Sequence, residues 1–496
     1  MLDNLIMGFG AALTPANLLW CFVGVLAGTV IGLLPGLGST TGVAVLLPLT
    51  LSFEPLTALI MLAGIYYGAQ YGGTITSVLI STPGEAASVV TAIDGYQMAR
   101  KGRAGAALSI AAIGSFAAAI VSLVLLVAMA PPFAELALGF GPPENLAVMV
   151  LGLATIVSFS SAGGRLRGLA MAVLGILLAT VGVDAATGLP RYTFGDVDLL
   201  SGLPFVQVMI GLFAVGEVLF QIRQGAAAPI RARFKDLMIT KAELSRSTGA
   251  IARGSVIGYL LGCLPGAGST LASFLAYGVE KRVSRNRHEF GQGAIEGVAA
   301  PESANNAAAN ANFVPTLALG IPGGATTAVL LGAFMMYGIQ PGPLLFEEQP
   351  ELVWGLLASF FLGNVMLLVL NLPLAPMFAQ LLRIPYGYMY PLILVTSFVG
   401  AYSIDNNMFS VWVVFVFGLV GYFMKKFDLP MAPLVLGLVV GALFEKALVQ
   451  TSAMGGGDLT IILTRPIALV VFLLAALLLA GPTLLKLIPR KQKETV

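Results

Sequence analysis

The chain has 496 residues, of which 57% are hydrophobic and only 10% are charged, and its mean hydropathy is +0.92. Soluble domains carry about 25% charged residues, so this composition excludes an ordinary soluble protein and indicates an integral membrane protein. Many of its apolar runs exceed about 18 residues, which favours helical spans over the alternating strands of a barrel.

A motif in the N-terminal half recurs in the C-terminal half. Gly28–Thr40 (GTVIGLLPGLGST) and Gly258–Thr270 (GYLLGCLPGAGST) agree at eight of thirteen positions. In each copy an apolar run enters a Pro-Gly-x-Gly break, where proline removes a backbone donor and glycine permits conformations that end a helix. Such a break is tolerated in hydrocarbon where it is buried in protein or lines a wet cavity. We therefore expect two hairpins, 18–51 and 254–279, around a binding site.

Lys and Arg predict which side of the membrane each loop faces, because cytoplasmic loops are enriched in them. The positive loops, expected inside, are 100–103, 165–167, 223–253, 281–287, 425–426 and 486–493. The loops poor in these residues, expected outside, are 131–144, 184–198, 342–351, 403–407 and 452–458. These sides alternate if spans lie at 106–130, 145–161, 168–187, 204–221, 352–373, 386–403, 408–424, 430–450 and 465–487.

The two hairpins differ in their flanking charge. Segment 254–279 has positive loops at both ends, so we expect it to be re-entrant from the cytoplasm. Segment 18–51 has no flanking Lys or Arg and is expected to open to the other side. Two copies of one motif in opposite orientations form an inverted repeat, which is typical of secondary transporters. The alternative is that residues 18–34 simply cross the membrane.

A second pair of matching segments follows the hairpins. Leu79–Ser88 (LISTPGEAAS) and Ala318–Thr327 (ALGIPGGATT) carry Pro-Gly inside apolar runs, which predicts helices unwound at Pro83-Gly84 and Pro322-Gly323. We therefore expect an all-α polytopic membrane protein with an inverted-topology repeat, two re-entrant hairpins, two discontinuous helices and about 11–12 spans. The first repeat would be 1–222, with its broken helix at 57–99. A cytoplasmic connector at 223–253 would lead to the second repeat, 254–496, with its polar and broken helix at 290–340.

Polar side chains gather between the second hairpin and its broken helix, in Ala300–Asn312 (APESANNAAANAN). Glu302, Asn306 and Asn310 share one helical face, and Asn305 and Asn312 form a neighbouring stripe. Side chains this polar usually face a cavity or a bundle interior, and amide oxygens suit a small hard cation. The alternatives are a hydrogen-bond ladder between helices or a helix in the headgroup region. The first half has tyrosine and glutamine at the corresponding positions: Tyr66, Tyr67, Gln70 and Tyr71.

The Gly-Ser-Thr ends of the repeated motif are candidate anion sites. Ser39-Thr40 and Ser269-Thr270 are expected to begin the return helix of each hairpin, where free N–H groups and the helix dipole attract an anion. Capping without a ligand is the alternative. Asn364, Asn371 and residues 405–407 are expected to be packing or loop-cap residues.

Several kinds of enzyme site are missing from the sequence. There is a single histidine, His288, no GxxxxGK[ST] phosphate loop and no CxxC pattern, and Cys21 and Cys263 are expected to pack in apolar runs. Residues 455–458 match the GxGD of intramembrane aspartyl proteases, but that chemistry needs a second membrane-embedded aspartate. We therefore expect neither an enzyme nor a cofactor, and the basic residues at span ends give no reason to expect nucleic acid.

These motifs together resemble a known family. GLLPGLGST, GCLPGAGST and PESANNAAANANFVPTLALGIPGGATTAVLLGAFMMYGIQPGP are similar to the large membrane subunit of tripartite tricarboxylate transporters, the TctA family, over essentially the whole chain. The resemblance implies a multi-pass protein of the bacterial inner membrane that imports organic acids with a Na⁺ or proton gradient. It also implies two partners, a small four-span membrane subunit and a periplasmic substrate-binding protein. The positive tail places the C-terminus in the cytoplasm.

Residues and resemblance together suggest one site built from the hairpin tips and the broken helices. The expected substrate-binding residues are Gly36, Gly38, Ser39, Thr40, Gly266, Gly268, Ser269, Thr270, Asn305, Asn306 and Asn310. A coupling-ion site is expected near Pro83, Asn306, Asn310 and Pro322. Rocking and elevator movements both remain open, and a passive channel or a non-transporting scaffold are the alternative functions.

Overall fold

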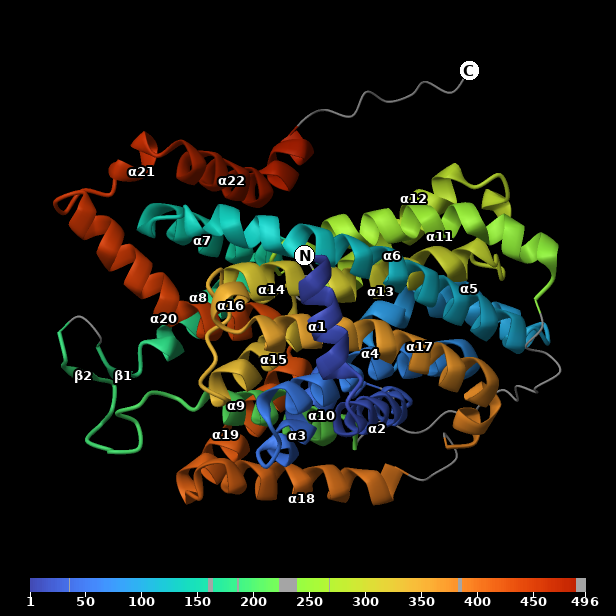
Figure 1. Ribbon diagram of the computed structural model, residues 1–496, viewed down its shortest axis with the longest axis horizontal. Helices are drawn as coiled ribbons and strands as arrows, with labels where there is room; N and C mark the ends of the chain where they lie inside the picture. The colour runs from blue at the N-terminus through green and yellow to red at the C-terminus, as the bar shows by residue number, and fades with distance from the viewer. Residues whose placement is uncertain are drawn as a thin grey trace. The chain divides into compact units, whose positions relative to one another are not determined.

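The computed structural model describes residues 1–34, 36–158, 164–184, 187–222, 239–266, 268–381 and 386–487. Nearly all of this described chain is helical, apart from connecting segments and a short antiparallel pair, β1 (Gly182–Val183) and β2 (Pro190–Arg191) (Figure 1). Five described helical segments are long and apolar enough to cross a membrane: Pro15–Gly32, Ala104–Leu138, Pro350–Leu374, Met408–Lys426 and Met431–Met454. The predicted all-α polytopic architecture is confirmed. Most of the predicted connector (223–238) and the tail from 488 lie outside the described residues.

The chain forms two compact units, and both sequence repeats contribute to the first. The first unit comprises Met1–Leu138 and Leu203–Phe427, and the second comprises Gly139–Gly202 and Asp428–Val496. The helices of the first unit are α1 (Leu2–Ala12), α2 (Pro15–Gly32), α3 (Gly38–Leu46), α4 (Pro55–Ile80), α5 (Val89–Arg100), α6 (Ala104–Leu138), α9 (Phe205–Met209), α10 (Gly216–Gln221), α11 (Lys241–Gly262), α12 (Gly268–Val283), α13 (Glu296–Ala311), α14 (Phe313–Leu319), α15 (Ala325–Met336), α16 (Leu345–Glu348), α17 (Pro350–Leu381), α18 (Tyr386–Asp405) and α19 (Met408–Lys426). Short 3₁₀ helices lie at Leu47–Thr50, Ala86–Ser88 and Arg287–Glu289, and a π-helical stretch at Ile210–Val215 joins α9 to α10.

The second unit contains α7 (Pro142–Ser158), α8 (Arg165–Ala179), α20 (Met431–Met454), α21 (Ile461–Thr464) and α22 (Pro466–Leu487). Within it, α8 and α20 approach closely because both carry glycine at the contact. A Cβ on Gly175 would lie 2.0 Å from the carbonyl oxygen of Leu434, and a Cβ on Gly437 would lie 2.3 Å from that of Ala172. Close backbone approach of this kind is characteristic of helices that associate in membranes.

Both copies of the repeated motif fold as helical hairpins, α2–α3 and α11–α12. The turns have matching backbones, with φ of +80° at Gly36 and +79° at Gly266, then +62° at Gly38 and +66° at Gly268. These values lie in the left-handed region that L side chains rarely adopt, which explains why the motif needs glycine at both positions. The conformation is therefore duplicated along with the sequence.

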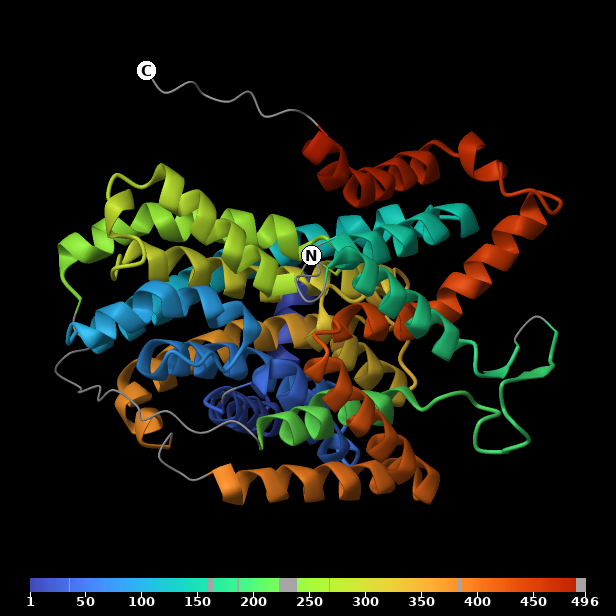
Figure 2. The same ribbon diagram turned by 180° about the vertical axis from the view of Figure 1, so that it is seen from behind.

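Each hairpin packs its first helix against a broken helix of its own repeat. Gly24, Gly28 and Gly32 of α2 face the backbone of α4, where an added Cβ would come within 2.2–2.3 Å of a carbonyl oxygen. Gly254, Gly258 and Gly262 of α11 face α13 in the same way, at 2.3–2.6 Å. The two pairs can be followed in Figure 1 and, from behind, in Figure 2. Glycine stripes four residues apart thus fix both hairpins against their partners.

The predicted helix breaks are present at both Pro-Gly pairs. Helix α4 ends at Ser81 with φ +55°, and α14 ends at Gly320 with φ +67°, so the same left-handed cap occurs in both repeats. After each cap the chain passes through Pro-Gly without helical structure, and helical structure resumes at Ala86 and at Ala325. The hydroxyls of Ser88 and Thr327 donate to the carbonyl oxygens of Glu85 and Gly324, at 2.8 and 3.0 Å.

Helix α11 begins in the described part of the connector. Thr240 caps it through the amide of Glu243, whose carboxylate accepts from the Thr240 amide in return. One turn further, Arg246 pairs with Glu296 at 2.6 Å and with Glu289. The hydrogen bond to Glu296 is the main reason that the pKa of the Arg246 guanidinium is raised above its usual value. These contacts fix the charged end of α11 against the start of α13.

Candidate functional site

The tip of the first hairpin is closed by side chains from both broken helices. The backbone amide of Ser39 donates to Oε2 of Glu85 at 2.7 Å. The hydroxyls of Ser39 and Thr40 lie 2.8 and 2.9 Å from the hydroxyl of Thr326. A carboxylate thus sits on the amide groups that begin α3, which is the position that a helix N-terminus offers to an anion. In the first repeat the protein supplies this anion itself.

The tip of the second hairpin lacks these closing side chains. When LISTPGEAAS is aligned with ALGIPGGATT, the residue that matches Glu85 is Gly324, and the residue that matches Thr326 is Ala87. A Cβ on Gly38 would lie 3.3 Å from Glu85, but a Cβ on Gly268 would meet no described atom within 4 Å. The second tip therefore has open space where the first has a carboxylate.

The second tip is nevertheless held in place by backbone contacts. The amide of Gly266 donates to the carbonyl oxygen of Gly323 at 3.0 Å, which ties the turn to the second helix break. A Cβ on Gly324 would lie 3.6 Å from the Cα of Gly268 and 3.5 Å from the side chain of Asn312. The turn of the second hairpin, the second helix break and Asn312 therefore lie next to one another.

Polar groups from α4 and α13–α14 converge near this point. The side chain of Asn312 lies 3.2 Å from the hydroxyl of Tyr66. In the orientation that satisfies both ends of the amide, its nitrogen donates to the carbonyl oxygens of Ala308 and Gly262, and its oxygen accepts from Tyr66. Through Asn312, Tyr66 of α4 therefore belongs to the polar groups beside the second tip.

Asn305 carries a buried amide that makes no hydrogen bond with the described part of the chain. Its side chain is fully buried, and neither its nitrogen nor its oxygen makes a hydrogen bond with the described chain. It lies seven residues before Asn312 and so shares that helical face. An unsatisfied buried polar group costs about 1–3 kcal/mol, so such a group is a natural contact for a ligand.

Asn306 and Asn310 are turned toward α6 instead. The amide nitrogen of Asn306 donates to the hydroxyl of Ser115 at 2.7 Å, and that of Asn310 donates to the hydroxyl of Ser122 at 2.8 Å and the carbonyl oxygen of Ala119 at 3.2 Å. These contacts form the hydrogen-bond ladder that the sequence left open as an alternative. Of the expected asparagines, Asn305 is therefore the one on the face that carries Asn312.

Sequence reasoning missed Glu85 and Thr326, which close the first tip. A signal was present in the two aligned Pro-Gly segments, because each of these residues stands opposite a small residue in the other repeat. A duplicated site with a side chain in one copy and a gap in the other indicates that only one copy is left open for a ligand. Tyr66, although noted as polar, could not be placed at the second tip without the fold.

Comparison with known proteins agrees with this architecture. The model of the tripartite tricarboxylate transporter TctA family matches residues 18–436, which include both hairpins and both helix breaks. The chain is 49% identical over 469 residues to an uncharacterized 52.8 kDa protein in the TAR-I ttuC' 3' region of Agrobacterium vitis, covering 94% of this chain and 93% of that protein. It is also 49% identical over 211 residues to an uncharacterized protein in the TAR-II ttuC' 3' region of the same organism, covering 42% of this chain and 87% of the relative. No solved structure matches the chain. The chain therefore belongs to the tripartite tricarboxylate transporter TctA family.

Proposed function

We propose that the chain is the large membrane subunit of a secondary transporter that imports organic acids by alternating access. The family match supports a transporter subunit, and the main evidence for the substrate site is the difference between the two hairpin tips. In the first repeat the carboxylate of Glu85 occupies the start of α3. In the second repeat the equivalent space, at the start of α12, is open to the carboxylate of a substrate.

The chemistry of the second tip suits a carboxylate. Helix α12 has 16 residues, and its first free amides carry the positive end of the helix dipole. The amide and hydroxyl of Ser269, with the hydroxyl of Thr270, would donate to one carboxylate oxygen or both. Asn305 offers an amide without competing partners to a second carboxylate or to a hydroxyl of the substrate.

The charge balance favours coupling to a cation. Neither hairpin tip and neither Pro-Gly segment contains Lys or Arg, so helix dipoles and hydroxyls must hold the substrate anion. Glu85 already places one buried carboxyl group in this region, and burying the charge of a substrate without compensation is unfavourable. Entry of an anion together with Na⁺ or a proton would relieve this penalty, whereas a passive anion channel would lack the compensating charge.

The tripartite family also supports the rest of the proposed system. We place the chain in a bacterial inner membrane with its C-terminus in the cytoplasm, together with a small four-span membrane subunit. A periplasmic substrate-binding protein would deliver the carboxylate. Saturable uptake that requires both an ion gradient and the binding protein would separate this function from a channel, which would conduct without either.

The experiment copies Glu85 into the second repeat as Gly324→Glu. The backbone of Gly324 is extended, and a Cβ there meets its neighbours at ordinary contact distances, so Gly324→Ala is a matched control. The purified chain would be tested for thermal stabilisation by a panel of citrate, malate, succinate and tartrate in Na⁺ buffer. We expect at least one acid to stabilise the wild-type and Gly324→Ala chains and to have no effect on Gly324→Glu. Equal stabilisation of all three chains would refute the site.

A further inference from the structure

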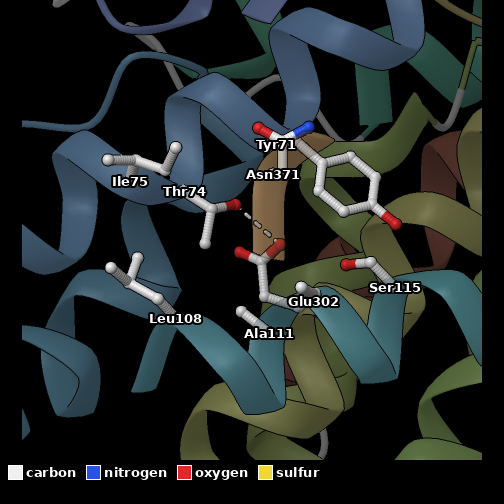
Figure 3. A pocket seen from close by; sticks show the side chains of 9 residues that line it. Tyr71, Thr74, Ile75, Leu108, Ala111, Ser115, Glu302 and Asn371 are labelled. Carbon is white, nitrogen blue, oxygen red and sulfur yellow. Dashed lines mark hydrogen bonds between the residues drawn. The ribbon is translucent and has the colours of Figure 1, made fainter. Parts of the chain in front are cut away.

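A small polar cavity lies where α4, α6, α13 and α17 meet, away from the two tips. Its volume is about 20 Å³, which is enough for one water-sized particle. The polar side chains on its wall are Tyr71, Thr74, Ser115, Glu302 and Asn371 (Figure 3). We call this space the Glu302 cavity. Figure 3 shows the carboxylate of Glu302 between Thr74 on one side and Tyr71 with Ser115 on the other.

Glu302 is a buried carboxylate with no positive partner among the residues that the structure describes. Its residue is 1% exposed, and its two oxygens accept from the hydroxyls of Thr74 at 2.7 Å and Thr91 at 2.5 Å. None of the ion pairs among the described residues includes Glu302. Hydroxyl donors stabilise an ionised carboxylate, but two of them do not replace its hydration. The site is therefore short of positive charge.

Asp94 shows how this protein satisfies a buried carboxylate when the role is structural. Asp94 is fully buried and accepts from three backbone amides at 2.8–2.9 Å and from the hydroxyl of Tyr277 at 2.8 Å. Glu302 has half as many donors and adjoins a cavity instead of close-packed backbone. The contrast indicates that the Glu302 carboxylate has room for a further ligand that binds and leaves.

Three buried oxygen atoms lack a hydrogen bond within the described chain, two of them on the cavity wall and one on Asn306, which donates to Ser115 of the wall. The hydroxyl of Tyr71 and the amide oxygens of Asn371 and Asn306 are buried and make no hydrogen bond within the described chain. The amide nitrogens of the same two asparagines are satisfied, by the carbonyl oxygen of Leu367 and by Ser115. A proton on Glu302 would satisfy one such oxygen at most. A hard cation accepts several oxygen ligands at once.

We infer that the Glu302 cavity is a Na⁺ site. Glu302 supplies the charge, and Tyr71, Ser115 and Asn371 supply neutral oxygen ligands. The inference rests on the proposed function, because an ion site inside a transporter of anions provides the coupling. On the other side of Thr74, which donates to Glu302, the chain packs against the first tip, since a Cβ on Gly73 would lie 2.9 Å from Glu85.

Binding of ²²Na⁺ to the purified full-length chain tests the site. The assay is run without any carboxylate, in choline chloride at constant ionic strength. Glu302→Gln keeps the shape of the side chain and removes its charge, so we expect Na⁺ affinity to fall at least about tenfold. Tyr71→Phe removes one neutral ligand and should weaken binding about three- to tenfold.

Tyr67→Phe is the matched control for Tyr71→Phe. Tyr67 is also on α4, is also buried, and its hydroxyl is also unpartnered, but it lies outside the cavity wall. We expect its Na⁺ affinity to match the wild type. Because neither hydroxyl makes a hydrogen bond with the described residues, neither change should impair folding, so a folding defect in Glu302→Gln leaves the test intact.

Two results would overturn the inference. One is Na⁺ binding that is equal in the wild-type, Glu302→Gln and Tyr71→Phe chains. The other is a wild-type chain that binds no Na⁺, in which case a proton or no ion occupies the cavity. The Na⁺ assay contains no organic acid, so a negative Na⁺ result does not bear on the carboxylate site tested by Gly324→Glu. Equally, a negative result for Gly324→Glu does not change the outcome of the Na⁺ assay.

Discussion

Replacing Asp94 tests how the start of the polar helix α13 is held. The Asp94 side chain, on α5, accepts from the amides of Gly291, Gly293 and Ala294 and from the hydroxyl of Tyr277. These donors lie just before α13 and on α12, so one carboxylate connects the first repeat to the second hairpin and the helix of Glu302. Asp94→Ala removes all four acceptor contacts.

The burial of the donors determines how much the free energy of unfolding should fall in Asp94→Ala. Gly291 is exposed and Gly293 is partly exposed, so water can replace the carboxylate there, whereas Ala294 and Tyr277 are buried. A buried hydrogen bond to a charged group contributes about 2 kcal/mol, so Asp94→Ala should lower the free energy of unfolding by about 4 kcal/mol. Asp94→Asn keeps one acceptor oxygen and should cost only about 1–2 kcal/mol.

Reversible unfolding in mixed detergent micelles, followed by tryptophan fluorescence, measures this difference. Asp458→Ala is the control, because its carboxylate lies in an exposed turn and, among the described residues, accepts hydrogen bonds only from nearby Thr460. That change should leave the free energy of unfolding close to that of the wild type. If Asp94→Ala lowers the free energy of unfolding by less than about 1 kcal/mol, the hydrogen bonds of Asp94 do not hold the two repeats together.

Two further changes test the hairpins. Glu85→Gln keeps an acceptor for the Ser39 amide but removes a charge from the start of α3; we expect the free energy of unfolding to fall by about 1 kcal/mol and carboxylate binding to be retained or tightened. Weaker carboxylate binding by this variant in the thermal assay would contradict the idea that Glu85 fills the first hairpin tip and takes no part in substrate binding. Gly258→Leu should prevent α11 from packing on α13, because even a Cβ would lie 2.3 Å from the carbonyl oxygen of Ala304. Gly278→Leu on α12, which has open space, should yield a monodisperse protein by size-exclusion chromatography when Gly258→Leu does not.

The helix breaks and hairpins were predictable because their causes are local. Pro83, Pro322 and the repeated glycines impose backbone conformations that few other residues tolerate, and those conformations appear in both repeats. The apolar spans were predictable for a similar reason, since their length alone matches the membrane. Each predicted span overlaps a described helix or, at 204–221, consecutive helical segments, but the span predicted at 168–187 is too long, because α8 ends at Ala179 and β1 follows.

The difference between the side chains at the two hairpin tips could be found only from the folded structure. Whether Glu85 reaches Ser39, 46 residues earlier in the chain, depends on how α4 packs against α2, and no local pattern encodes that distance. The Glu302 cavity likewise joins residues from four helices. Asn371 was expected to be a packing residue, and its place on the cavity wall follows only from the approach of α17 to α6.

Cysteine accessibility at the second tip tests the central claim most directly. In a chain with Cys21 and Cys263 replaced by alanine, Ser269→Cys would be labelled with a small thiosulfonate reagent, with and without the carboxylate panel in Na⁺ buffer. Gly278→Cys, an exposed position on the same helix, is the control. The account predicts that at least one carboxylate slows labelling at 269 and leaves labelling at 278 unchanged. Equal rates at 269 with every acid, or equal slowing at both positions, would contradict a carboxylate site at the start of α12.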